Sequence, residues 1–271
     1  MPLFNLAAST IASWEAEVGP SPIHGLGIEL SNGGYIEKHQ HRRGQMMTAP
    51  TGVMTVKVAD RFYVVAGARG IWIPKNIPHE VVASTDVNLR NLQITHSIAP
   101  TLPNNVRMFS VSPLFRELME SAINGEQWIR KGSREEKILQ LLVMEFCVAN
   151  DMIFTFPEPK DIRLKRVCSI LKDNPGDNRS LEEWSKTAGG CARTLGRLFY
   201  KETGLTFAQW RRQLRLHDAV IRLYRGQPIT SIALDTGYDN PSSFIEMFRR
   251  VTGRTPGQYL DDRIENFSVK N

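Results

Sequence analysis

The chain has 271 residues, enough for two domains that each bury a hydrophobic core. Its hydrophobic fraction of 41% and charged fraction of 23% are typical of a water-soluble globular protein. No apolar run approaches the roughly 20 residues that span a bilayer, and the N-terminus lacks the basic start and apolar core of a signal peptide. The three cysteines form no CxxC pair, so we expect no disulfide scaffold and a reducing cytoplasm.

The net charge of +6 is unevenly distributed. Residues 1–160 hold 15 basic and 15 acidic side chains, whereas residues 161–271 hold 19 basic and 13 acidic ones. All of the excess positive charge therefore lies in the last part of the chain. Such asymmetry favours a polyanionic partner, of which nucleic acid is the commonest.

Short strands are predicted first and helices afterwards. From Ile23 to Thr95, β-branched and aromatic runs alternate with Gly, Pro and Asn, which is typical of a sandwich or barrel. Two helices should follow, one capped by Ser112 ahead of Pro113 and one opened by the capping box Ser133-x-x-Glu136. The two prolines of FPEPKD indicate a linker, and the remainder is predicted to be helical.

The C-terminal part repeats itself. Four positions recur 48 residues later and, after a one-residue insertion, six more recur 49 residues later. The first copy carries Leu181, Trp184, Ser185, Gly189, Leu195, Phe199, Thr203, Gly204, Thr206 and Trp210, and the second Ile229, Ile232, Ala233, Gly237, Phe244, Phe248, Thr252, Gly253, Thr255 and Tyr259. Ten matched positions in register predict two copies of one supersecondary unit.

Each copy has the pattern of a helix-turn-helix. A small residue, Ser185 or Ala233, lies four positions before a glycine that allows a tight turn. Between the copies, the capping box Thr206-x-x-Gln209 predicts a helix that runs to about Arg225. Its length of about 28 Å would place two recognition helices near one DNA turn apart.

These stretches, RTLGRLFYKETGLTFAQWRRQLRL and ITSIALDTGYDNPSSFIEMFRRVTGRTPGQYL, resemble the DNA-binding domain of the AraC/XylS family of bacterial transcription regulators. The resemblance covers residues 164–260 and both copies. It departs from the family at Gly190, where a bulky apolar residue is usual, and at Cys191, where Ser or Thr is common. Gly196 stands at a commonly polar, base-facing position.

The resemblance implies which side chains meet DNA. On the first recognition helix these are Arg193, Thr194 and Arg197, with Gly196 beside them, and either arginine could pair bidentately with guanine. On the second helix the matching positions are Ser242, Ser243 and Glu246, where Glu246 either accepts from cytosine or stays solvated. Phosphate contacts are expected from Arg211, Arg212, Arg249 and Arg250.

A second resemblance lies in the first half. Gly33, His39-x-His41, Gln45 and Gly52 match the spacing of the first cupin motif, and GARGIWIPKNIPHEVVA partly matches the second with Pro74 and His79. Residues 23–96 thus resemble a cupin-type effector domain. Gln45 replaces the usual metal-binding Glu, and Ala83 the usual final Asn.

Alternation along one strand should place His39 and His41 on the same face, where they can meet His79. Such a site suits a divalent transition metal. We favour the alternative, in which unmetallated histidines hydrogen-bond an organic effector, because one ligand is lost at Gln45. The predicted pocket is completed by Trp72, with Met46, Met47 and Tyr63 as further apolar lining.

We therefore predict an α+β protein of two domains: a cupin-like β-barrel followed by helices, and an all-α domain with two helix-turn-helix units joined by a long helix. Six segments are expected, namely a flexible lead-in (1–20), an effector-binding barrel (21–97), a helical transmission or dimerisation segment (98–155), a linker (156–163), the double helix-turn-helix domain (164–262) and a tail (263–271).

The predicted function is a non-enzymatic, sequence-specific transcription regulator. Its partners would be promoter DNA, a small-molecule effector, a second copy of the chain and, for an activator, RNA polymerase. The helix from Glu136 to Ala149 either forms the seam with the second copy or packs on the barrel. A metal-dependent cupin enzyme with an appended DNA-binding module is the alternative, and an architectural DNA-binding protein without a ligand is a third hypothesis.

Overall fold

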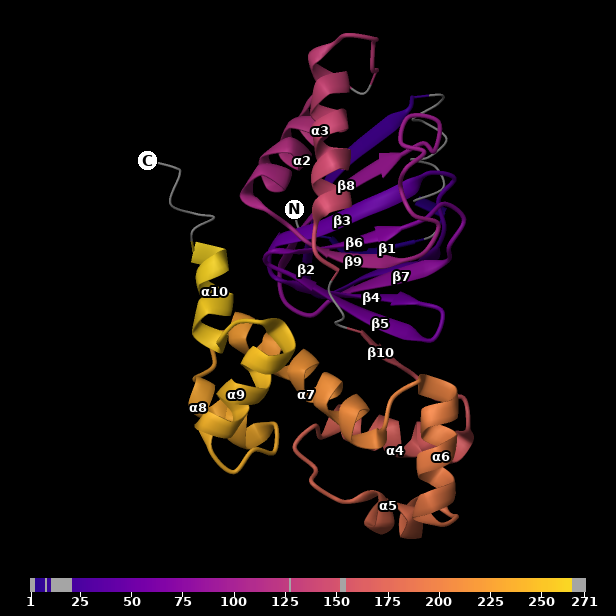
Figure 1. The fold of residues 1–271 in the computed structure, drawn as a ribbon, viewed down its shortest axis with the longest axis vertical. Coiled ribbons are helices and arrows are strands. Elements are labelled where there is room, and N and C mark those ends of the chain that lie inside the picture. The colour runs from indigo at the N-terminus through magenta and orange to yellow at the C-terminus, as the bar shows by residue number, and fades with distance from the viewer. Residues whose placement is uncertain (1–2, 8, 11–20, 127, 152–154, 265–271) are drawn as a thin grey trace. The chain divides into compact units, whose positions relative to one another are not determined.

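The computed structural model describes residues 3–7, 9–10, 21–126, 128–151 and 155–264. The chain forms two compact units. The sheet unit comprises Met1–Ala59, Tyr63–Phe154 and Asp262–Asn271, and the helical unit comprises Asp60–Phe62 and Thr155–Asp261 (Figure 1). Among the described residues, no helix is both long and apolar enough to cross a bilayer.

One curled, mostly antiparallel sheet forms the core of the sheet unit. The strands follow the order β10-β5-β4-β7-β2-β8-β3-β6-β9, and β1 pairs with β2 in parallel. Their bounds are β1 Leu3–Leu6, β2 Ile23–His39, β3 Gly44–Thr51, β4 Val53–Val58, β5 Arg61–Ala66, β6 Arg69–Ile73, β7 His79–Ala83, β8 Val87–Ile94, β9 Arg107–Ser110 and β10 Thr155–Pro157.

The long strand β2 curls the sheet, because it pairs with two different neighbours. Its first half, Ile23 to Leu30, pairs with β8, and its second half, Tyr35 to His39, pairs with β7. Gly33 lies between the halves with φ +81°, a conformation that favours glycine. The change of partner brings the end of β2 beside the start of β7, where His39 pairs with His79.

Two helices cover one face of this sheet. Helix α2 (Pro113–Asn124) begins at Ser112, whose side chain accepts from the Phe115 amide, and α3 (Arg134–Val148) begins at Ser133. Both N-caps confirm the sequence prediction, but the predicted capping box at Ser133 is not complete, because the Glu136 carboxylate accepts from the Gly132 amide rather than from the Ser133 amide. The helices bury a core that includes Trp72, Met46, Leu92, Phe109, Phe115, Leu142 and Phe146.

The helical unit contains seven described helices. They are α4 (Ile162–Asp173), α5 (Leu181–Ala188), α6 (Ala192–Thr203), α7 (Phe207–Tyr224), α8 (Ile229–Asp235), α9 (Pro241–Thr252) and α10 (Pro256–Ile264). Full capping boxes open α5 at Ser180 and α7 at Thr206, and Asn240 caps α9. The local signals in the sequence therefore specify these helix starts.

The predicted duplication is present. Helices α5 and α6 form the first helix-turn-helix unit, α8 and α9 form the second, and α7 connects them (Figure 1). The 18 residues of α7 span about 27 Å. Trp184, Leu195, Phe199, Trp210, Phe244 and Phe248 are fully buried, as their repeat positions predict.

Three predicted boundaries differ from the structure. Leu3–Leu6 of the supposedly flexible lead-in form β1, because they find hydrogen-bonding partners along β2; residues 11–20 lie outside the described part. The sheet extends beyond 21–97, since β9 pairs with β6. The linker 156–163 is partly ordered as β10 and the first turn of α4, and most of the tail lies outside the described residues.

Candidate DNA-binding surface and histidine pocket

Helix α6 presents a basic face to solvent. Arg193 and Arg197 are exposed, and Thr194, half-buried, lies beside them. Gly196 lies at the edge of this face, where a Cβ atom would come within 3.3 Å of the Leu181 side chain of α5. The missing side chain at this position therefore allows α5 and α6 to pack closely.

Two further side chains on the same face were not predicted from the sequence. Tyr200 is 60% exposed although it is large and partly apolar, and Lys201 is exposed one residue further along α6. Positions 193, 197, 200 and 201 are spaced with the helical period and therefore lie on one face of α6. This spacing could have identified Tyr200 and Lys201 from the sequence. An exposed aromatic side chain next to arginines is suited to contact with DNA sugar or bases.

Helix α9 presents its equivalent face. Ser242, Ser243, Glu246, Arg249 and Arg250 are all exposed, as contact with DNA would require. Arg250 Nη2 donates to Glu246 Oε1 at 2.7 Å, so this carboxylate is paired within its own helix. The second recognition face therefore offers the hydroxyl groups of Ser242 and Ser243 and the guanidinium group of Arg249, while the Glu246 carboxylate is already paired.

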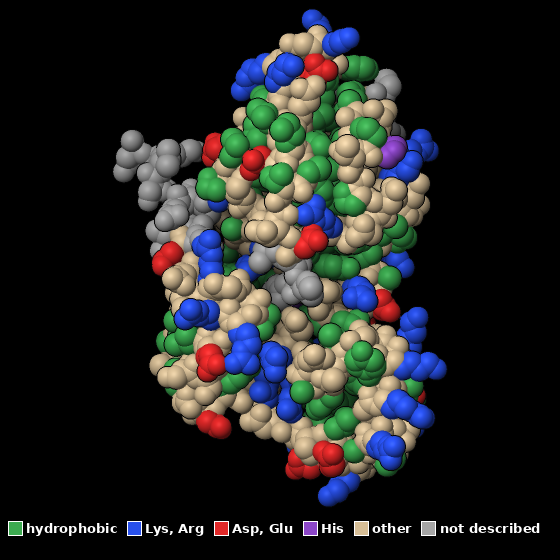
Figure 2. All heavy atoms as spheres, viewed as in Figure 1, with side chains coloured by type: hydrophobic (Ala, Val, Ile, Leu, Met, Phe, Trp, Pro, Cys, Tyr) green, Lys and Arg blue, Asp and Glu red, His purple; other side chains and the backbone are tan. Residues whose placement is uncertain are grey.

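A basic groove of about 300 Å³ runs between α7 and α9. It is lined by Ala208, Arg211, Arg212, Arg215, Tyr238, Ser243, Glu246, Met247 and Arg250. Figure 2 shows Lys and Arg side chains gathered over this part of the helical unit. Arg212 is exposed, whereas Arg211 donates to the Arg179 carbonyl at 2.8 Å and lies over the Phe207 ring. Arg212 is thus available for a phosphate contact, while Arg211 has a structural role as well.

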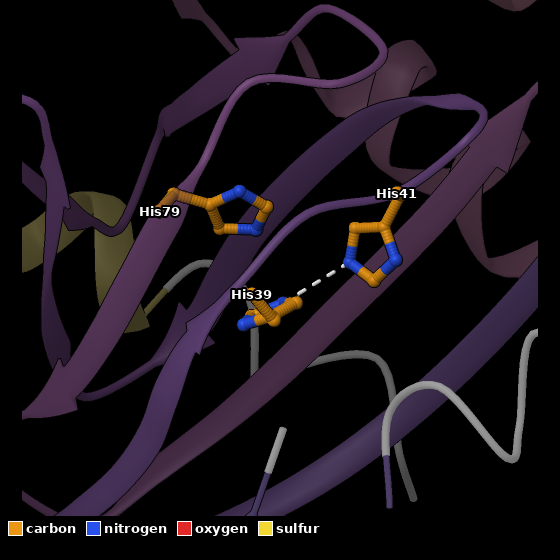
Figure 3. A group of neighbouring side chains, drawn as sticks. All are labelled: His39, His41 and His79. Carbon is orange, nitrogen blue, oxygen red and sulfur yellow. Dashed lines mark hydrogen bonds between the residues drawn. The ribbon is translucent and has the colours of Figure 1, made fainter. Parts of the chain in front are cut away.

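The three predicted histidines meet in the sheet unit. His39 is the last residue of β2, His79 is the first of β7, and His41 lies in the turn before β3. Figure 3 shows their rings facing one another, and their ligand atoms all lie within 4.8 Å. The prediction that His39 and His41 share one strand was wrong, because β2 ends at His39; the turn nonetheless returns His41 to the same site.

Hydrogen bonds fix the tautomers of these rings. His39 Nδ1 lies 2.6 Å from the Glu37 carbonyl and His79 Nδ1 lies 2.9 Å from the Ile77 carbonyl. Because a carbonyl only accepts, both Nδ1 atoms carry the proton and both Nε2 atoms present lone pairs. His41 Nδ1 accepts from the Gln93 amide at 3.1 Å, and its Nε2 lies 3.1 Å from that of His39.

The buried histidines are neutral at ordinary pH. Burial, together with the repulsion that a protonated His41 would meet from a protonated His39, lowers the pKa of His41 to about 3. The same two causes lower the pKa of His79 to about 3. Neutral imidazoles are the form that binds metal ions.

The surroundings of the rings are rich in acceptors. Within the described residues, His79 Nε2, Gln45 Oε1, Asn91 Oδ1 and Gln93 Oε1 are buried and accept no hydrogen bond. The cavity beside them is about 20 Å³, room for one water-sized body. The rest of its wall comprises His24 and the apolar side chains of Leu26, Ile28, Ile36, Met47, Val81 and Leu89.

The structure corrects part of the predicted lining. Trp72 and Met46 lie on the opposite face of the sheet, in the core beneath α2 and α3, and Trp72 Nε1 donates to the Pro103 carbonyl. Tyr63 is buried but does not line the cavity either. His24, Asn91 and Gln93 line it instead. Leu89, Asn91 and Gln93 are alternate residues of β8, so their side chains lie on the same face of the strand. This alternation could have identified Asn91 and Gln93 as pocket residues from the sequence.

Comparison with known proteins places the chain in a family. A family model described as a helix-turn-helix domain matches residues 184–262. The HTH-type transcriptional regulator NimR of Escherichia coli (strain K12) is 31% identical over 222 residues, which are 82% of this chain and 81% of NimR. RipA of Corynebacterium glutamicum is 37% identical over 114 residues, 42% of this chain and 34% of RipA.

Solved structures are more distant. ToxT from Vibrio cholerae O395 matches 89% of this chain and 98% of its own, at 13% identity and a TM-score of 0.38. A DNA-binding transcriptional dual regulator from Escherichia coli K-12 matches 39% of this chain and 94% of its own, at 24% identity and a TM-score of 0.35. The extent of the match to NimR, with the duplicated helical unit, decides the assignment: the chain belongs to the AraC-type family of helix-turn-helix transcriptional regulators.

Proposed function

We propose that the chain is a one-component regulator whose affinity for promoter DNA is controlled by what binds in the histidine pocket. The observation that carries the proposal is the combination of two basic helix-turn-helix units with a separate buried site of unpartnered acceptors. Because the regulator acts on the chromosome, we place it in the cytoplasm. Nothing in this function requires a chemical reaction.

The two recognition helices would read adjacent major grooves. Arg193 and Arg197 of α6 are the groups for direct contact with base edges, where bidentate pairing with guanine discriminates by about 1–3 kcal/mol. On α9, the pairing of Glu246 with Arg250 favours contact through Ser242 and Ser243. Arg212 and Arg249 would hold phosphates and set the register of the protein on the duplex.

The geometry of the pocket supports a divalent transition-metal ion as its direct occupant, in place of the organic effector on unmetallated histidines that the sequence favours. The cavity is too small for an organic effector in this conformation, and three imidazoles with a neutral surrounding fit an ion such as Zn²⁺, Ni²⁺ or Cu²⁺. Two Nε2 lone pairs are already directed inward. If the Gln93 amide flipped, its oxygen would accept a hydrogen bond from a protonated His41 Nδ1. The lone pair of His41 Nε2 would then face those of the other two histidines.

The ion would make the pocket a ligand-binding site. A bound transition metal offers open coordination positions to an effector that carries oxygen or nitrogen donors. Gln45 contributes no negative charge where a carboxylate would. The site should therefore hold its ion more weakly than a site with an acidic ligand, and an exchangeable ion suits a sensor.

A second copy of the chain is the proposed protein partner. Leu141, Met144 and Val148 are 46%, 64% and 76% exposed and follow one face of α3. Figure 2 shows apolar side chains on this side of α2 and α3. An exposed apolar stripe on a helix is typical of a helix–helix interface.

The direct test of the proposed function is selection of binding sites. The full chain is incubated with a pool of random double-stranded DNA, and the bound fraction is amplified and sequenced over several rounds. We expect an enriched motif of two half-sites whose centres lie about 10 base pairs apart. A pool that stays random after selection would refute sequence-specific binding.

A further inference from the structure

A charged side chain is buried at the centre of the helical unit. Arg215 lies midway along the connecting helix α7 and is only 7% exposed. Burial lowers the pKa of its guanidinium, which means that the charged form is held there at a cost. The side chain lies 5.5 Å from the centre of the Tyr238 ring. An arginine at such a position needs a specific set of acceptors.

Its acceptors come from the segment that leads into the first helix-turn-helix unit and from the turn of the second. Nε donates to the Pro175 carbonyl at 2.9 Å, and Nη2 donates to Asn178 Oδ1 at 2.8 Å and to the Asp177 carbonyl at 3.2 Å; all three lie in the segment that leads into α5. Nη1 donates to the Gly237 carbonyl at 3.4 Å, in the turn between α8 and α9. One guanidinium therefore joins the entrance of the first unit to the turn of the second.

The two backbone segments also touch directly. Asn178 Nδ2 donates to the Gly237 carbonyl at 3.2 Å. A Cβ atom at Gly176 would lie 2.5 Å from the Asp235 carbonyl oxygen, and one at Gly237 would lie 2.6 Å from the Gly176 carbonyl oxygen. Glycine at both positions is thus required for this approach. We call residues 175–178, residues 235–238 and Arg215 together the interlock.

The interlock and the apolar cores contribute differently: the cores stabilise the fold, whereas the interlock fixes the relative orientation of two backbone segments. The cores of the two units are filled by aromatic side chains that need no arginine. Apolar packing tolerates small changes of angle, whereas hydrogen bonds from a planar guanidinium to carbonyl groups fix direction as well as distance. Apolar side chains could join the two segments without burying a charge, and replacement of a whole buried polar network by apolar side chains often costs little stability. The arrangement is therefore better explained by geometry than by stability.

We propose that Arg215 is a positioning residue that fixes the angle between the two helix-turn-helix units and thereby the half-site spacing that the protein accepts. The inference rests on the proposed two-groove binding and names a residue that does not touch DNA in that mode. With the interlock intact, α6 and α9 behave as one rigid body. Without it, the second unit can rotate about the end of α7.

The test is a spacing series of the selected DNA site. Two base pairs are inserted between the half-sites, which turns one half-site by about 70° relative to the other. The wild-type chain should lose at least about tenfold in affinity on insertion. Arg215→Met should bind the optimal spacing more weakly and lose less than about threefold on insertion, and Arg215→Lys should lie between them because an ammonium lacks the planar fork.

Two controls separate positioning from stability. Leu171→Ala opens a cavity in the core of the first unit and destabilises it without touching the interlock. Arg166→Met removes an exposed arginine of α4 and matches the change of charge. Both should keep the wild-type dependence on spacing. The same loss on insertion in Arg215→Met as in the wild type would overturn the proposal.

A measurement without DNA keeps the two proposals distinguishable. Spin labels are placed at Lys201 and Arg250, on the two recognition helices, in chains whose exposed Cys147 and Cys191 are replaced by Ser. The label-to-label distance distribution should be narrow in the wild type and Leu171→Ala, and broader in Arg215→Met. Equal widths would overturn the interlock even if sequence-specific binding holds, and a random selected pool would overturn the binding proposal alone.

Discussion

His39 and His41 place their Nε2 atoms 3.1 Å apart, although β2 ends between the two residues. At this distance one ring must donate and the other accept. The Asn76 amide donates to the His41 carbonyl at 2.7 Å and so fixes the turn that carries His41 back over the strand end. The close approach of two neutral rings, with a third nearby, is the geometric basis of the proposed metal site.

Metal content should depend on this contact. Untagged wild-type protein, analysed by plasma mass spectrometry after incubation with Zn²⁺ and desalting, should carry about one ion per chain. The double variant His39→Ala/His41→Ala should carry less than about a tenth of that. His96→Ala, which removes an exposed histidine outside the site, should match the wild type. Equal metal in the double variant and the wild type would place the ion elsewhere.

Sequence discrimination should depend on Arg193 and Arg197. Alanine at either position should reduce the preference for the selected site over random DNA by about 1–3 kcal/mol, or roughly 5- to 150-fold, because a contact to base edges is lost. Arg212→Ala should instead weaken binding to both DNAs alike and make binding less dependent on salt. Fluorescence anisotropy on both DNAs distinguishes the two outcomes. A uniform loss for the α6 arginines would assign them to phosphates.

Self-association should depend on the exposed stripe of α3. Met144→Glu places a charge at the centre of that stripe and should shift the chain from dimer to monomer in sedimentation velocity at micromolar concentration. Thr101→Glu introduces the same charge at an exposed residue outside α3 and should leave the dimer intact. If both variants sediment as the wild type does, α3 is not the interface.

Acid should destabilise the helical unit through His217. Burial lowers the pKa of this side chain to about 4, from an ordinary value of 6.5. As the pH falls below 6.5 the unfolded chain takes up a proton that the folded chain does not, so stability present at neutral pH is lost progressively toward pH 4. The loss amounts to about 2 kcal/mol at pH 5.

His217→Gln removes this linkage. Thermal unfolding of the variant, followed by circular dichroism, should show a smaller drop in Tm between pH 7 and pH 5 than the wild type shows. An equal drop in both proteins would mean that other groups account for acid sensitivity.

Much of the helical unit was predictable from local signals. Ser180, Thr206 and Asn240 each cap the helix that their sequence context indicates, because a cap depends only on neighbouring residues. The repeat positions identified the buried aromatic residues for the same reason. Arg215 gave no such signal, since its acceptors at Pro175 and Gly237 are about 40 and 22 residues away.

In the sheet unit, local signals in the sequence were not sufficient to place every side chain. The cupin-like spacing identified all three histidines, but Trp72 was assigned to the wrong face. Its neighbours across the sheet, Met46 on β3 and Arg107 on β9, depend on strand pairing that alternation alone does not give. The contribution of β1 was missed for the same reason, because an edge strand is defined by its partner.

Sequence-specific binding is tested by the affinity of the full chain for its selected site and for a scrambled DNA of equal length. Both are measured by fluorescence anisotropy at three salt concentrations. We expect at least about a thousandfold preference for the selected site, and affinities for both DNAs that fall steeply with salt. Equal affinity for the two DNAs at every salt concentration would contradict it, since charge alone would then account for binding.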